Sequence, residues 1–395
     1  MRLASRMSRL GTETAFEVLS RAKALEKLGR NIVHLEIGEP DFDTPQHIID
    51  EAAQALNNHA THYTPSAGIP ELRQSIAHYV NRTRELDVSP ENVVVVPGGK
   101  PIIFFAIMAL VNQGEEVIYP NPGFPIYESM INFVGGRAVP IPLKMEREFS
   151  FDISDLERLI TPKTRMLILN SPANPTGGVM TQSDLEAIAQ LVVSHDLIVL
   201  SDEIYSRILY EGEFCSIASL AGMLERTIIL DGFSKTYAMT GWRLGYGVMP
   251  VDVAQAVSRL ITNSVSCTGT ATQLAGVKAL NSSQDDVDLM VARFKERRDI
   301  IVKGLNQVPG FHCLVPRGAF YAFPNISETG MKAKDLADYL LADASVATLA
   351  GTAFGQYGEG FLRLSYAASI ENINKALDRI DVAVRKLERK PHPAT

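Results

Sequence analysis

The sequence is poor in cysteine. Its 395 residues include only Cys215, Cys267 and Cys313, which lie far apart and form no Cys-x-x-Cys pair. An odd and dispersed set argues against a disulfide scaffold or a zinc site, and it is typical of proteins in a reducing cytoplasm. His59 and His62 lie close together but have no third ligand residue nearby, so we predict no metal ion.

Long apolar runs and an excess of positive charge are also missing. The longest apolar run, residues 102–111, is too short to cross a bilayer, and the N-terminal residues contain no continuous apolar segment typical of a secretory signal. Lys and Arg total 38 against 45 Asp and Glu, a net charge of −7, which argues against nucleic acid as a partner. We therefore expect a cytoplasmic protein that binds neither membrane nor nucleic acid.

Strand-like apolar segments alternate with helical patterns over the first 250 residues. These segments are residues 93–96, 116–120, 165–170, 197–201 and 227–230. Residues 183–193, between two of them, have the spacing of an amphipathic helix. This alternation predicts an α/β fold, in which a mostly parallel sheet is flanked by helices on both faces.

The remainder of the chain has a different pattern. Residues 287–305 form a long amphipathic pattern, and helical patterns recur at 333–341 and 370–387. Residues 311–323 and 361–365 have the composition of strands. A chain of 395 residues is long enough for one large domain and a smaller one, and we assign this last part to the smaller domain.

Residues that could take part in catalysis or ligand binding fall at the ends of the predicted strands. They are Gly99, Phe124, Asn174, Asp202 and Lys235. Because ligands of open α/β sheets bind in the crevice beyond the carboxyl ends of the strands, we expect these residues to surround one site.

Lys235 and its neighbours indicate an aldehyde cofactor that carries a phosphate. Most lysines are solvated, and a solvated loop lysine is the simplest alternative here. A lysine held in a loop at a strand end is partly desolvated, which lowers its pKa and lets its amine form a Schiff base. Ser234 and Arg243 are placed to hold a phosphate, and the turn at Gly98 and Gly99, followed by a helix start, offers free N–H groups to an anion. Pyridoxal phosphate (PLP) has both groups.

The rest of the predicted cofactor site is a carboxylate and two aromatic residues. Asp202 is a candidate partner for the pyridine nitrogen, because an opposite charge keeps that nitrogen protonated. An aromatic ring such as that of Phe124 suits stacking on the flat cofactor ring, and Tyr205 could donate to the ring oxygen. A core phenylalanine and a half-buried tyrosine are the alternatives.

Four segments resemble class I/II aminotransferases, the aspartate aminotransferase-like enzymes of PLP fold-type I. The segments are residues 63–73, Asn174-Pro-Thr-Gly177, Ser234-Lys235 with Gly241-x-Arg243-Leu-Gly245, and Gly360-x-x-Arg363-x-Ser365. The resemblance extends from residue 38 to residue 363 and implies a smaller α+β domain built from both termini. We expect an N-terminal arm at residues 1–45, a large PLP-binding domain at 46–286 and a small domain at 287–395.

The resemblance also implies a role for each site residue. Lys235 would hold PLP as an internal aldimine and, once released, move a proton between substrate and cofactor. Asn174 and Tyr205 would contact the ring oxygen. The implied phosphate ligands are Ser234, Arg243, the backbone at Gly99 and Lys100, and Tyr63 from the other subunit of a homodimer. Arg363, with Asn174 and Gly38, would bind the substrate α-carboxylate.

The implied reaction is ping-pong transfer of an amino group between an L-amino acid and a 2-oxo acid. A PLP lyase or decarboxylase would use the same residues, so it stays an alternative. A PLP-binding transcription regulator is not expected, because too few residues precede Gly38 for a DNA-binding segment. The side chain of Lys100 favours aspartate or glutamate as substrate, whereas Phe16 and Phe124 favour aromatic or aliphatic amino acids.

Overall fold

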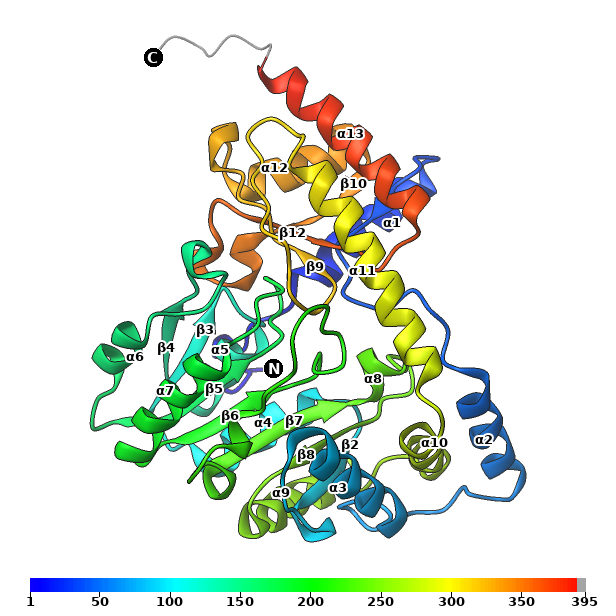
Figure 1. Ribbon diagram of the computed structural model, residues 1–395, viewed down its shortest axis with the longest axis vertical. Helices are drawn as coiled ribbons and strands as arrows, with labels where there is room; N and C mark the ends of the chain where they lie inside the picture. The colour runs from blue at the N-terminus through cyan, green and yellow to red at the C-terminus, as the bar shows by residue number, and fades with distance from the viewer. Residues whose placement is uncertain (389–395) are drawn as a thin grey trace.

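A seven-stranded sheet forms the centre of the computed structural model, which describes residues 1–388 (Figure 1). The strand order is β2-β8-β7-β6-β5-β3-β4. The strands are β2 (Val93–Val96), β3 (Glu116–Asn121), β4 (Arg137–Pro142), β5 (Thr164–Asn170), β6 (Ile198–Asp202), β7 (Thr227–Gly232) and β8 (Gly245–Val248). Strand β8 is antiparallel to both neighbours and the other pairs are parallel, which confirms the mostly parallel sheet.

Helices cover both faces of this sheet, as predicted. Successive residues of β2 point to opposite faces, so Val93 and Val95 join one apolar core while Val94 and Val96 join another. The helices around the sheet are α2 (Gln46–Asn57), α3 (Pro70–Arg84), α4 (Lys100–Leu110), α5 (Ile126–Val134), α6 (Ile153–Leu159), α7 (Gln182–Ser194), α8 (Phe233–Thr236), α9 (Val251–Ser264) and α10 (Thr270–Asn281). Burial on both faces explains why these strands read as continuous apolar runs.

Segments from near both ends of the chain, among them α1 (Thr14–Lys27) and α13 (Ile370–Glu388), lie together in a second body, above the sheet in Figure 1. Its other helices are α11 (Asp285–Leu305) and α12 (Ala333–Tyr339). Strand β1 (Val33–His34) pairs in parallel with β10 (Val346–Ala347), and β12 (Leu362–Ser365) lies between β11 (Leu349–Ala350) and β9 (Tyr321–Ala322) in a small antiparallel sheet. Figure 1 shows α11 running from beside α10 up to α13.

Short helical turns occupy many of the connections. They are η1 (Ser5–Arg9), η2 (Pro90–Asn92), η3 (Met145–Arg147), η4 (Ile217–Ser219), η5 (Leu224–Arg226), η6 (Ser327–Thr329), η7 (Leu340–Ala344), η8 (Gly351–Phe354) and η9 (Gln356–Gly358). Within residues 1–388, no helix has both the length and the apolar character needed to cross a membrane.

One strand prediction was largely wrong. Of residues 311–323, only Tyr321–Ala322 form a strand, and the rest is held by isolated bridges such as His312 to Asn325. Pro316 lacks an N–H donor and Gly318 weakens extended structure, so this apolar segment cannot sustain a ladder.

Candidate active site

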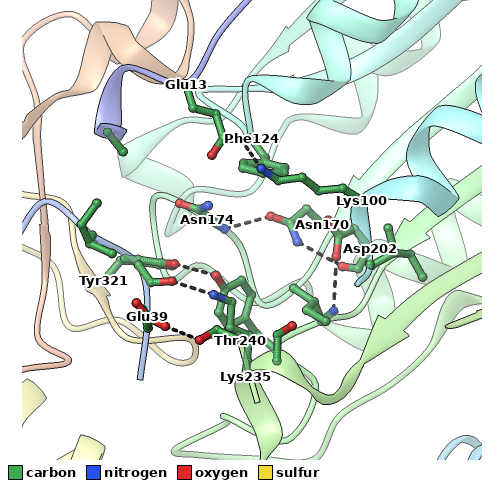
Figure 2. A pocket seen from close by; sticks show the side chains of 18 of the residues that line it. Glu13, Glu39, Lys100, Phe124, Asn170, Asn174, Asp202, Lys235, Thr240 and Tyr321 are labelled. Atoms are coloured by element: carbon green, nitrogen blue, oxygen red, sulfur yellow. Dashed lines mark hydrogen bonds and ion pairs between the residues drawn. The ribbon is translucent and has the colours of Figure 1, made fainter. Parts of the chain in front are cut away.

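A cavity of about 530 Å³ lies where β5, β6 and β7 end (Figure 2). The predicted site residues that line it are Gly38, Gly99, Lys100, Phe124, Asn174, Asp202, Tyr205, Ser234, Lys235, Arg243 and Arg363. Parallel strands bring their carboxyl ends to one edge of the sheet, which explains why residues so distant in sequence meet. Tyr63 does not line this cavity, and it is 88% exposed.

Lys235 lies in a helical turn and not in the predicted loop. Helix α8 starts directly after β7 and closes with a bond from Tyr237 N–H to Phe233 O of 3.1 Å. No glycine or proline interrupts residues 233–240, so the backbone can form this turn. The Lys235 amine donates to Gly38 O at 2.6 Å.

The environment of Lys235 favours the neutral amine. The pKa of Lys235 is lowered from 10.5 to about 8, mainly because the amine is buried. The charge of Glu39 opposes this shift, and the positive charges of Arg363, Lys100 and Arg243 contribute to it. A lysine with this pKa is nucleophilic near neutral pH.

Asp202 is a buried carboxylate at the end of β6. The Tyr127 hydroxyl donates to it at 2.6 Å and the backbone N–H of Ile204 at 3.3 Å. Burial raises its pKa to about 6, and the charges of Asp231 and Glu203 act in the same direction. Among residues 1–388, Asp202 forms no ion pair. A protonated ring nitrogen would supply the missing positive charge, so the site fits a pyridinium group.

Another part of the cavity wall presents hydrogen-bond donors. Gly98 has a φ of 84°, and any side chain there would overlap the Arg243 guanidinium. Arg243 itself has a left-handed φ of 55°, and its guanidinium donates to Thr240 O at 2.6 Å. The buried Ser234 and the first turn of α4, which begins after Gly99, complete a set of donors that suits a phosphate.

Arg363 is buried in β12 with unused donor capacity. Its guanidinium donates to Glu36 O and, at 3.3 Å, to Asn174 Oδ1, while its Nε has no partner within residues 1–388. The rings of Tyr321 and Phe354 lie 4.7 and 4.9 Å from its central carbon and hold it in place. Burial lowers the pKa of Arg363, but arginine stays charged at neutral pH. A buried cation of this kind fits a substrate carboxylate.

The aromatic residues differ in their surroundings. The Tyr205 side chain is fully buried and not half-buried, and its hydroxyl lies 2.5 Å from that of Tyr321. Burial raises the pKa of Tyr205 well above its usual value. Phe124 is partly buried, and its ring centroid lies 5.4 Å from the Lys100 amine.

Three residues of the site were missed from sequence. Tyr127 donates to Asp202, Tyr321 contacts Tyr205 and Arg363, and Glu13 forms an ion pair with Lys100. Figure 2 shows Glu13 reaching down from the N-terminal segment towards Lys100. No local pattern marks these residues, because each meets its partner only through the tertiary fold.

The fold and the donor set define an enzyme that uses pyridoxal phosphate: one reactive amine, one buried carboxylate and a phosphate cradle face a single cavity. Residues 30–380 match the model of the family "Aminotransferase class I and II", and the chain belongs to this family. It is a PLP-dependent aminotransferase, whose substrates are an amino acid and a 2-oxo acid. This favours transamination over the lyase and decarboxylase alternatives.

Named relatives cover nearly the whole chain. Aromatic-amino-acid aminotransferase 2 of Thermococcus litoralis is 40% identical over 390 residues, which are 98% of this chain and 99% of the relative. Aspartate aminotransferase of Pyrococcus abyssi is 41% identical over 361 residues, 90% and 92% of the two chains. The structure of aspartate aminotransferase from Thermus thermophilus with maleate matches with a TM-score of 0.93 at 38% identity, over 97% of this chain and 100% of that one.

Proposed function

We propose that Lys235 is the residue that carries the cofactor and, when freed, moves the proton at the substrate α-carbon. When bound, PLP supplies an electron sink that stabilises negative charge on that carbon. The neutral Lys235 amine, which its low pKa favours, is a suitable proton acceptor. Its bond to Gly38 O keeps the amine at the cavity wall.

The other cofactor contacts divide between the ends of the site. We assign Asp202 to the ring nitrogen, Phe124 to the ring face, and Asn174 and Tyr205 to the ring oxygen. The proposed phosphate ligands are Ser234, Arg243 and the backbone N–H groups of Gly99 and Lys100. The absence of an ion pair at Asp202 within the described chain supports its assignment.

The position of Arg363 supports our proposal that the substrates are α-amino acids. Its unpartnered Nε and its Asn174 contact leave room for two parallel bonds to a carboxylate, with the Gly38 backbone nearby. The test is transamination of a panel of amino donors with 2-oxoglutarate, set against amines of the same side chains that lack the carboxylate. Comparable turnover of the amines would contradict the role of Arg363.

Two substrate classes have support. Lys100 supplies a cation for the distal carboxylate of aspartate or glutamate, and relatives include aspartate aminotransferases. Phe16, Phe124 and Ile103 line the same cavity and favour aromatic or aliphatic side chains, and one relative is an aromatic-amino-acid aminotransferase. The donor panel separates the two classes.

We also propose a cytoplasmic homodimer in which Tyr63 reaches the phosphate of the partner site. The exposure of Tyr63, and of Leu56 nearby in sequence, supports an interface there. Light scattering tests the dimer, and Tyr63→Phe should weaken PLP binding. For the domains, we propose the boundaries 1–45, 46–286 and 287–395, supported by the pairing of β1 with β10.

A further inference from the structure

Glu13 occupies an unusual position in the cavity. It is the N-cap residue of α1, but its side chain makes no capping hydrogen bond. Glutamate is not among the residues that usually cap a helix through their side chains, so its carboxylate can pair elsewhere. The Glu13 carboxylate instead enters the cavity and pairs with the amine of Lys100, and its side chain is only 18% exposed (Figure 2).

The charges of the cavity show what this ion pair does. The described lining residues include four cations: Lys100, Lys235, Arg243 and Arg363. Under the proposed function, the last three serve the cofactor aldehyde, the phosphate and the substrate α-carboxylate. Lys100 then remains for a second substrate carboxylate, and Glu13 already neutralises it.

We propose that Glu13 is a specificity-determining residue that competes with the distal carboxylate of the substrate for Lys100. With Glu13 in place, the Glu13–Lys100 pair has no net charge, and the cavity wall near Phe124 accepts aromatic side chains. Aspartate or glutamate must displace Glu13 before its own carboxylate can reach Lys100. The inference rests on the proposed function, and it identifies Glu13 as the residue that sets the enzyme's preference between the two substrate classes.

The N-terminal segment allows such a displacement. None of residues 1–21 is buried, and the first buried side chain is Ala22. Few polar contacts hold the segment before α1 to the body, among them Gly11 N–H to Ser129 Oγ at 2.8 Å and Arg9 to Phe133 O at 3.2 Å. Because a partly exposed ion pair is weak, a substrate carboxylate can replace the Glu13 carboxylate, and a variant at this position should fold normally.

The test measures the first half-reaction alone, so that no 2-oxo acid complicates the comparison. PLP-loaded enzyme is mixed with aspartate or with phenylalanine, and the loss of the cofactor absorbance gives kcat/KM for each. Glu13→Gln should raise the value for aspartate by about fivefold, the upper range for a partly exposed ion pair, mainly through KM. The value for phenylalanine should stay within about twofold.

Two controls make the result specific. Glu17→Gln changes an exposed carboxylate on the same helix outside the cavity and should alter neither value. Adding Lys100→Met to Glu13→Gln should abolish the gain for aspartate. An unchanged ratio of the two substrates in Glu13→Gln, or an equal rise for both, would overturn the inference while the proposed function stands. Failure of the unmodified enzyme to react with either amino acid would overturn the proposed substrates and the inference together.

Discussion

The rate at which the apoprotein takes up PLP should rise with pH around a midpoint near 8. Only the neutral amine of Lys235 attacks an aldehyde, and burial lowers its pKa from 10.5 to about 8. At pH 7.5, a lysine with the ordinary pKa of 10.5 is neutral in about 0.1% of molecules. A lysine with a pKa of about 8 is neutral in about 24% of molecules. Uptake at this pH should therefore be about 200-fold faster than with an ordinary lysine, because the amine is protonated below its pKa and neutral above it.

Two substitutions should move this midpoint in opposite directions. Glu39→Gln removes a negative charge that raises the pKa of Lys235, so the midpoint should fall. Lys100→Met removes a positive charge that lowers this pKa, so the midpoint should rise. The assay is stopped-flow absorbance after mixing apoprotein with PLP, at constant ionic strength, over a pH series on both sides of 8. A midpoint near the ordinary value of lysine, or shifts of the same sign in both variants, would refute the electrostatic reasoning.

The remaining predictions concern binding and stability. Arg363→Lys should raise KM for amino acids by about 10- to 100-fold, because a lysine cannot form the two parallel bonds, while the absorbance of bound PLP persists; equal loss of PLP would contradict the assignment. Arg84→Met should destabilise the fold by about 3–5 kcal/mol in urea unfolding, because Arg84 pairs in the buried interior with Glu203 at 2.7 Å and Asp231 at 2.5 Å; a change below about 1 kcal/mol would count against this. In the apoprotein, Asp202→Asn should raise stability above pH 6 by up to about 3 kcal/mol, because the pKa of Asp202 is raised to about 6 and folding then opposes its ionisation. This gain should fade as the pH falls towards 4, and a gain independent of pH would contradict the assigned cause.

The sequence predicted the residues whose positions depend on local signals. Asp202 and Lys235 follow apolar strands, and the parallel sheet brings such strand ends to one edge, so their convergence was predictable. The helical turn at Lys235 was not, because α8 has four residues and gives no periodic pattern.

Contacts between distant segments explain the other omissions. Glu13 and Lys100 are 87 residues apart, and Tyr205 and Tyr321 are 116 residues apart. Each pair depends on how the N-terminal segment or β9 packs against the large sheet. Residue spacing carries no information about such packing.

The proposed chemistry depends on the amine of Lys235 forming the bond to the cofactor. Borohydride reduction of the PLP-loaded enzyme makes this bond permanent, and peptide mapping by mass spectrometry then identifies the labelled side chain. We expect one cofactor label per chain, on Lys235. A label on Lys100, which lines the same cavity, or no label in protein that shows the absorbance of bound PLP, would contradict it.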